Sequence, residues 1–100
     1  MNATSKTYFE KNFSKFQEEY AEIRKEIQEY KEKHGIKSHT LGDITYYRLC
    51  IKEWEKYRQI RMVRAILKDD ERMFIRNDIP FIKSKISFCR NCISELGVRK

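Results

Sequence analysis

The sequence predicts an all-α domain in which a long antiparallel helical hairpin is followed by a third, C-terminal helix, packed as a coiled-coil-like three-helix bundle. Two observations predict this fold. Apolar residues recur at alternating spacings of three and four, the period of a helix that buries one stripe of its surface. Glycine and proline are sparse, with three glycines and one proline in 100 residues, so a few long elements are expected. All three helices are assigned to a single domain, residues 1–100.

The first helix is expected over about residues 7–34. Its start is marked by the capping-box sequence from Thr7 to Glu10, and its end by Gly35, because glycine readily takes the left-handed conformation that terminates helices. A heptad seam between these points predicts lengthwise packing against another helix. The seam consists of Phe9, Phe13, Phe16, Tyr20, Ile23, Ile27, Tyr30 and His34.

The second helix is expected over about residues 41–76, with Thr40 as its N-cap and Asp43 in the capping-box position. Its apolar residues cover a wider face than a single seam, which predicts a central helix with neighbours on two sides. A break near Asp69 is the alternative, because an aspartate there would cap a new helix although no glycine or proline enforces one.

The third helix is expected over about residues 79–96. Asp78 is its expected cap, Pro80 falls in the first turn where a missing N–H costs nothing, and Gly97 ends it. The apolar seam of this helix has the same alternating spacing as the first. It consists of Ile79, Ile82, Ile86, Cys89, Ile93 and Leu96.

Cys89 and Cys92 form a C-x-x-C pair, which has three interpretations: a zinc clamp, a redox couple or ordinary packing residues. A zinc site would need His34 and His39 as further ligands. If the second helix is unbroken, Cys92 lies level with Val63, roughly 30 Å from the histidines at 1.5 Å per residue. A redox pair needs a βαβ context that this pattern does not predict. We therefore expect a packing role for Cys89, no metal site and no cofactor.

The charge of the chain is strongly basic, with 22 Lys and Arg against 15 Asp and Glu, a formal net charge of +7. Such a surplus favours association with nucleic acid or with an acidic protein, although a basic row is also commonly solvated or internally paired. An acidic row on the first helix (Glu19, Glu22, Glu26 and Glu29) is expected level with residues 47–57 and so not opposite the basic row. The basic row is the candidate site for an anionic partner: Arg58, Arg61, Arg64, Lys68, Arg72 and Arg76.

Catalytic signatures are lacking in the sequence: it has no glycine-rich phosphate loop, no nucleophile elbow and no convergent carboxylates. We therefore predict a protein that is not an enzyme and has no small-molecule substrate. An odd number of cysteines, three, favours a reduced compartment, and no run approaches the roughly 18 apolar residues of a membrane span. The expected location is cytoplasmic, with no membrane association.

Two function classes follow from these features. The first is a small helical interaction protein, an adaptor, inhibitor or regulator, which binds a protein partner through its helical surfaces. A second copy of the chain is one such partner, because a homodimer would complete a larger bundle. The alternative is a basic nucleic-acid-binding protein that contacts the phosphate backbone through the Arg and Lys face of the second helix.

Overall fold

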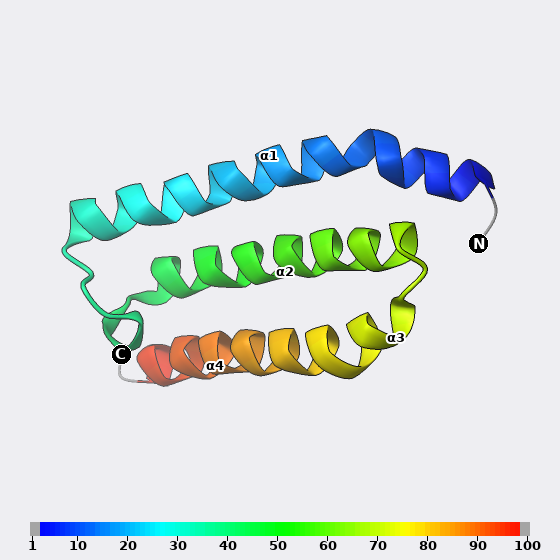
Figure 1. Ribbon diagram of the computed structural model, residues 1–100. Helices are drawn as coiled ribbons and strands as arrows, with labels where there is room; N and C mark the ends of the chain where they lie inside the picture. Colours follow the sequence, from blue (N-terminus) through cyan, green and yellow to red (C-terminus); the bar gives the residue numbers. More distant parts are fainter. Residues whose placement is uncertain (1–2, 99–100) are drawn as a thin grey trace.

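The computed structural model describes residues 3–98, with side chains from residue 7 onward. Three long helices, α1 (Ala3–His34), α2 (Ile44–Leu67) and α4 (Ile79–Val98), lie side by side in that order (Figure 1). Short helical segments join them: η1 (His39–Leu41), α3 (Glu71–Met73) and η2 (Phe74–Asp78). The predicted all-α fold, a long antiparallel hairpin plus a third helical rod, is confirmed. Within residues 3–98, no helix carries an apolar run sufficient to traverse a bilayer.

Helix α1 ends where the sequence predicts and begins earlier. Gly35 takes a φ of +65°, and the N–H of Ile36 bonds to the carbonyl of Lys31 at 2.9 Å, a common glycine-terminated helix end. The backbone is already helical at Ala3, so the predicted capping box at Thr7 is wrong. Extending a formed helix adds one hydrogen bond per residue without a new nucleation cost, and nothing between these residues breaks it.

Helix α2 is capped by Asp43, so the predicted N-cap at Thr40 is wrong. The Asp43 carboxylate accepts a hydrogen bond from the N–H of Tyr46 at 2.8 Å and another from the Tyr30 hydroxyl at 2.7 Å. Burial acts to raise the pKa of Asp43, but these two hydrogen bonds, together with the His34 side chain and the N–H of Thr45, hold the pKa below its usual value. Thr40 lies instead in η1, which Ser38 caps. One carboxylate thus starts α2 and ties it to α1.

Gly42 fits a close approach to the ring of Tyr46. A Cβ at this position would overlap that ring, although the backbone conformation itself, with φ −84° and ψ 167°, suits any residue. The N–H of Gly42 donates to the hydroxyl of Tyr47 at 3.2 Å, and that hydroxyl donates to the carbonyl of His39 at 2.8 Å. The connection between α1 and α2 is therefore held on the first turn of α2.

Helix α2 ends at Leu67, so the predicted continuous helix to residue 76 is wrong and the alternative break near Asp69 is confirmed. Asp69 takes the left-handed conformation with a φ of +54°, which aspartate tolerates better than most residues. The N–H of Asp70 then bonds to the carbonyl of Ala65 at 2.9 Å. This bond, with that from the N–H of Asp69 to the carbonyl of Ile66 at 3.2 Å, closes a tight turn without glycine, and the chain reverses there.

Helix α4 begins at Ile79, as predicted, but it has no cap there. The chain is already helical from Glu71, and α3, η2 and α4 together form one continuous third rod. Pro80 has no N–H to offer, and its ring crowds the carbonyl four residues earlier. The π-helical turn η2 precedes it, in which the N–H of Ile79 bonds to the carbonyl of Phe74. We infer that the wider turn accommodates the proline, which a regular α-helix would not. Asp78, the expected cap, pairs instead with Arg61 at 3.2 Å.

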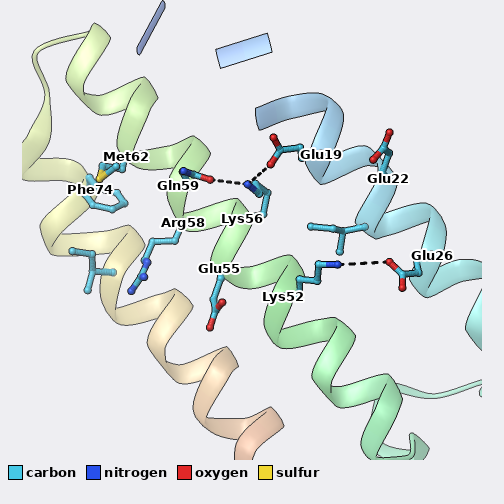
Figure 2. Close-up of a pocket in the computed structure, with 12 residues that line it drawn as sticks. Glu19, Glu22, Glu26, Lys52, Glu55, Lys56, Arg58, Gln59, Met62 and Phe74 are labelled. Atoms are coloured by element: carbon cyan, nitrogen blue, oxygen red, sulfur yellow. Dashed lines mark hydrogen bonds and ion pairs between the residues drawn. The ribbon is translucent and has the colours of Figure 1, made fainter. Parts of the chain in front are cut away.

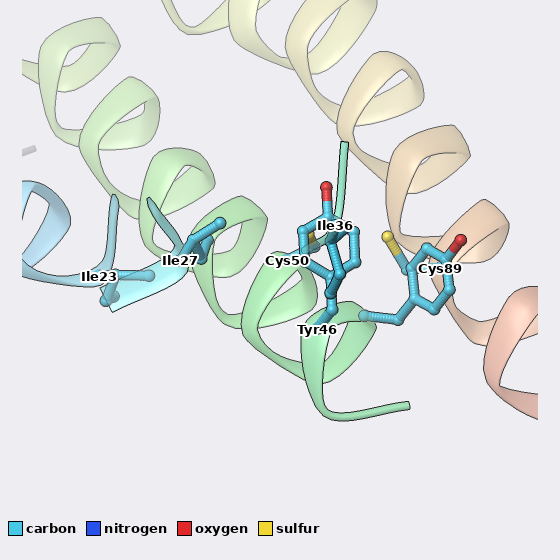
Figure 3. Close-up of a cluster of buried hydrophobic side chains, with 7 residues drawn as sticks. Ile23, Ile27, Ile36, Tyr46, Cys50 and Cys89 are labelled. Atoms are coloured by element: carbon cyan, nitrogen blue, oxygen red, sulfur yellow. The ribbon is translucent and has the colours of Figure 1, made fainter. Parts of the chain in front are cut away.

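Helix α2 lies between α1 and α4, as its broad apolar face predicts. Over residues 3–98, close backbone approaches join α1 to α2 and α2 to α4, and none joins α1 to α4. One buried cluster lies toward the loop (Figure 3) and another toward the Lys68 turn. Their buried members are, respectively, Ile23, Ile27, Ile36, Tyr46, Tyr47, Cys50 and Cys89, and Phe16, Ile60 and Val63. The molecule is therefore a layer of three rods, 51 by 26 by 18 Å.

Replacing Gly42 with alanine tests the contact between the connection and α2. The added methyl group would overlap the Tyr46 ring, so we expect Gly42→Ala to lower the free energy of unfolding by roughly 1–3 kcal/mol, as other overpacking substitutions do. Urea denaturation followed by circular dichroism measures this change. Gly97→Ala is the control, because a Cβ added there would have nothing within 4 Å and the helix should be unchanged or stabilised. Equal stability of both variants would contradict the close approach.

Candidate functional site

The layer leaves a groove on one face, running along α2 between α1 and the third rod (Figure 2). We call it the wide groove; its volume is about 820 Å³. Four apolar side chains, two of them buried, form its floor: Ile23, Met62, Phe74 and Ile79. Glutamates of α1 form one wall, namely Glu19, Glu22 and Glu26. A polar-rimmed groove with an apolar floor is a shape that accepts another helix.

Lysines of α2 neutralise part of the glutamate wall. The Lys56 ammonium donates to Glu19 at 2.5 Å and to Gln59 at 2.9 Å, and Lys52 pairs with Glu26 at 3.9 Å (Figure 2). The hydrogen bond from Lys56 lowers the pKa of Glu19. The expected level of the acidic row, beside the loop-proximal half of α2, is confirmed by these pairs. Glu22 forms no ion pair within the described residues.

The predicted basic row does not lie along one helix. Three of its members are on α2, Lys68 is the C-cap of that helix, and Arg72 and Arg76 follow the turn on α3 and η2. The α2 members have different surroundings. Arg58 lines the wide groove, Arg61 is paired with Asp78, and the Arg64 guanidinium lies over the Phe13 ring, 5.7 Å from its centre. Binding of an anionic partner by these six residues remains a prediction.

The opposite face carries four aromatic rings in sequence across all three rods. Tyr20 of α1 lies 6.0 Å from Tyr57 of α2, Tyr57 lies 5.5 Å from Trp54, and Trp54 lies 5.8 Å from Phe81 of α4, centre to centre. We call these four the aromatic row. The Arg24 guanidinium lies over Tyr20 at 5.8 Å, and the Lys85 ammonium lies over Phe81 at 5.2 Å. A cation thus covers each end of the row.

A smaller cavity of about 320 Å³ opens beside the aromatic row. We call it the basic cavity, because its lining includes Arg24 and Lys31 of α1, His39 of η1 and Lys85 of α4. Burial, with the nearby charges of Lys85 and Lys31, lowers the pKa of His39, so its imidazole is neutral at pH 7. Burial raises the pKa of Glu53, the carboxylate in the lining, against the opposing effect of Arg24 at 3.6 Å.

These two features on the second face were missed in the sequence. By their spacing, Trp54 and Tyr57 belong to the broad apolar face of the second helix, whereas Phe81 falls outside the isoleucine seam of the third. The available signal in the sequence was the position of Phe81, which follows Ile79 by two residues and so falls off the buried seam. In the structure its side chain is 50 % exposed. A cluster that joins three helices becomes visible only once their relative register is known.

The cysteines lie near the loop, which corrects the predicted register. Cys89 points from α4 toward Cys50 of α2 (Figure 3), and Cys92 packs against the same cluster. The ring of His39 stacks on Phe88 at 5.2 Å. The predictions that Cys92 lies level with Val63, and that the thiols lie far from the histidine loop, are therefore wrong. Because α2 ends at residue 67, the third rod begins earlier and its cysteines lie closer to the loop.

The packing role predicted for Cys89 is confirmed, since its side chain is fully buried. Burial raises the pKa of the Cys89 thiol to about 11 and also raises that of Cys50. Both thiols are therefore protonated at neutral pH, whereas metal binding and nucleophilic attack need the thiolate. Across residues 3–98, no three or more His, Cys, Asp or Glu side chains are grouped to hold a metal ion.

Comparisons of the chain with models of protein families, with curated proteins and with solved structures found no match. The two faces of the layer offer different surfaces: a wide groove with an apolar floor, and an aromatic row beside a basic cavity.

The different surroundings of the thiols predict their reactivity. At pH 8 we expect an aromatic disulfide reagent to label Cys92 quickly in the native protein, because that residue is only partly buried. Cys50 and Cys89 should react only after unfolding in guanidinium, since buried thiols of raised pKa are poor nucleophiles. Absorbance kinetics and peptide mass spectrometry measure this. A Cys92→Ala control should lack the fast phase, and fast labelling of Cys89 in either protein would contradict the packing.

Proposed function

We propose that the protein is a non-enzymatic helical interaction module that pairs with a second copy of itself across the wide groove. One observation carries this proposal: α1 and the third rod pack on α2 but not on each other, which leaves the groove along α2 open. A second layer would cover Met62 and Ile79, which are still partly exposed. Two stacked layers of antiparallel rods form a larger bundle with a continuous core.

The walls of the groove carry opposite charges. Glutamates line the α1 wall, and two of them are partly neutralised by lysines of α2. On α4, Lys83 and Arg90 follow Ile79 by four and eleven residues, which places them on the groove side of that helix. Arg58 of α2 also lines the groove. One wall is therefore acidic, whereas the other is mainly basic and includes one carboxylate, that of Glu55 on α2.

Oppositely charged positions lie at similar heights along the rods. Glu26 pairs with Lys52 and Glu19 pairs with Lys56, so Glu22 lies near the level of residue 54 on α2. Trp54 contacts Phe81 on its other side, which places Lys83 close to the same level. Glu22 and Lys83 are consequently near one another in height on the two walls, with the groove between them.

A two-fold axis parallel to the rods makes these walls self-complementary. Such an axis sets α1 of each copy over α4 of the other and leaves each residue at the same position along the rod axis. Glu22 of one copy therefore approaches Lys83 of the second copy, and symmetry repeats this contact once more. A perpendicular axis in the plane of the layer would set glutamates on glutamates, which like-charge repulsion disfavours. The face, 51 by 26 Å, exceeds the roughly 800 Å² per partner of a stable interface.

Charge reversal tests the pairing. We expect Glu22→Lys and Lys83→Glu each to weaken dimerisation about tenfold or more, since each creates like-charge contacts on both sides of the axis. The double variant restores opposite charges and should recover affinity to within about threefold of the wild type. Sedimentation equilibrium at 50 mM salt measures the dissociation constants.

Lys85→Glu is the matched control, because Lys85 lies on the other face of the same helix and should leave the dimer intact. A wild-type protein that remains monomeric at 100 µM would contradict the proposal. So would a double variant that is no better than either single change, because the two side chains would then not meet.

A further inference from the structure

We propose that the aromatic row and the basic cavity together form a binding surface for nucleotide units of single-stranded nucleic acid. This surface is on the opposite side of the layer from the wide groove, so the inference is independent of the proposed self-association. It also differs from the basic row of the sequence analysis. Its main cations are on α1 and α4, and its rings come from all three rods.

The aromatic row supplies surfaces for bases. Its members are partly exposed, and Phe81 has half of its surface open to solvent. Bases of any identity stack on such rings, because each base has a flat π face. In a duplex the bases are already stacked inside and their faces are unavailable to side chains. The row therefore favours a single strand over a duplex.

The basic cavity supplies cations for phosphate. Lys31 of α1 and Lys85 of α4 line it together with His39 of η1. Neither lysine forms an ion pair within the described residues. Glu53, the carboxylate in the lining, is paired with Arg24. The lining is positive at pH 7, and a phosphate would find lysines that lack a competing carboxylate partner.

The chemistry extends beyond one nucleotide. The volume of the cavity, about 320 Å³, is near the lower end of ligand pockets and suits one nucleotide unit. Arg64 lies over Phe13 on α1, farther from the loop, and repeats the cation-on-ring arrangement of Arg24 over Tyr20. A strand that binds the cavity therefore meets a second ring and cation along the same pair of helices.

Oligothymidylate of 15 nucleotides is the probe, followed by fluorescence anisotropy of a 5′ label and by quenching of Trp54. Trp54 is the single tryptophan of the chain and belongs to the aromatic row, so its emission reports binding at this surface. We expect saturable binding at 50 mM salt that weakens at 200 mM, with quenching of Trp54. No binding at 50 mM salt, or binding without quenching, would overturn the proposal.

Two neighbouring lysines on opposite faces of α4 provide a matched pair of variants. Lys85→Glu should weaken binding at least about tenfold, whereas Lys83→Glu makes the same charge change on the groove side and should weaken it less than about threefold. Equal losses would indicate general attraction to a basic protein and would overturn the proposal. Phe81→Ala should weaken binding about fivefold at both salt concentrations, because stacking depends little on salt; an unchanged affinity would remove the aromatic row from the site.

Three competitors distinguish the source of the ligand: a 15-base-pair duplex, polyglutamate and free thymidine monophosphate. The proposal requires that none of the three displaces the labelled strand as effectively as unlabelled strand does, when they are compared at equal concentration of negative charge. Displacement by the duplex or by polyglutamate as effective as by unlabelled strand would overturn it in favour of phosphate-backbone or acidic-protein binding. Equal displacement by the free monophosphate would show that the cavity binds a single nucleotide, and would overturn the proposal that it binds a strand.

Discussion

The structure depends on the need to cover α2 on two opposite sides. Ile60 and Val63 of this helix pack toward α1, whereas Cys50 and Trp54 pack toward α4. One partner helix cannot cover both directions, so the chain must place a rod on each side. The result is a layer, in which the outer helices lie too far apart to close over α2. Both exposed faces of the molecule are consequences of that arrangement.

The two faces differ because helical periodicity sends neighbouring residues in different directions. Glu22 lines the wide groove and Arg24 lines the basic cavity, although only one residue separates them. Lys83 and Lys85 diverge in the same way on α4. One face therefore combines an apolar floor with opposed charges, which suits another protein layer. The other combines rings with lysines that form no ion pair among the residues that the structure describes, which suits nucleotides. The net positive charge of the chain does not by itself reveal this difference between the two faces.

Residue periodicity and the glycine at position 35 were sufficient to predict the hairpin, the central place of α2 and the burial of Cys89. The early start of the third rod, at Glu71, was not predictable by the same means, because Pro80 suits a first turn as well as a residue after a π turn. Thr40 and Asp43 are both good caps, and the hydrogen bond from Tyr30 that favours Asp43 is a tertiary contact. The largest error was the predicted level of Cys92 along α2. It arose because the predicted α2 was too long, and each residue added to the end of α2 shifts the residues of the third rod that lie opposite it.

That register is the central claim, because it brings Phe81 to Trp54 and places Lys83 level with Glu22. The most direct measurement is a set of nuclear Overhauser effects between aromatic side chains in the labelled protein. The structure requires cross-peaks between the rings of Phe88 and Tyr47, whose centres lie 6.4 Å apart, and between Phe88 and His39. Cross-peaks from Cys92 to Val63 in place of these would show that the third rod is packed in the other register, and would contradict both faces described above.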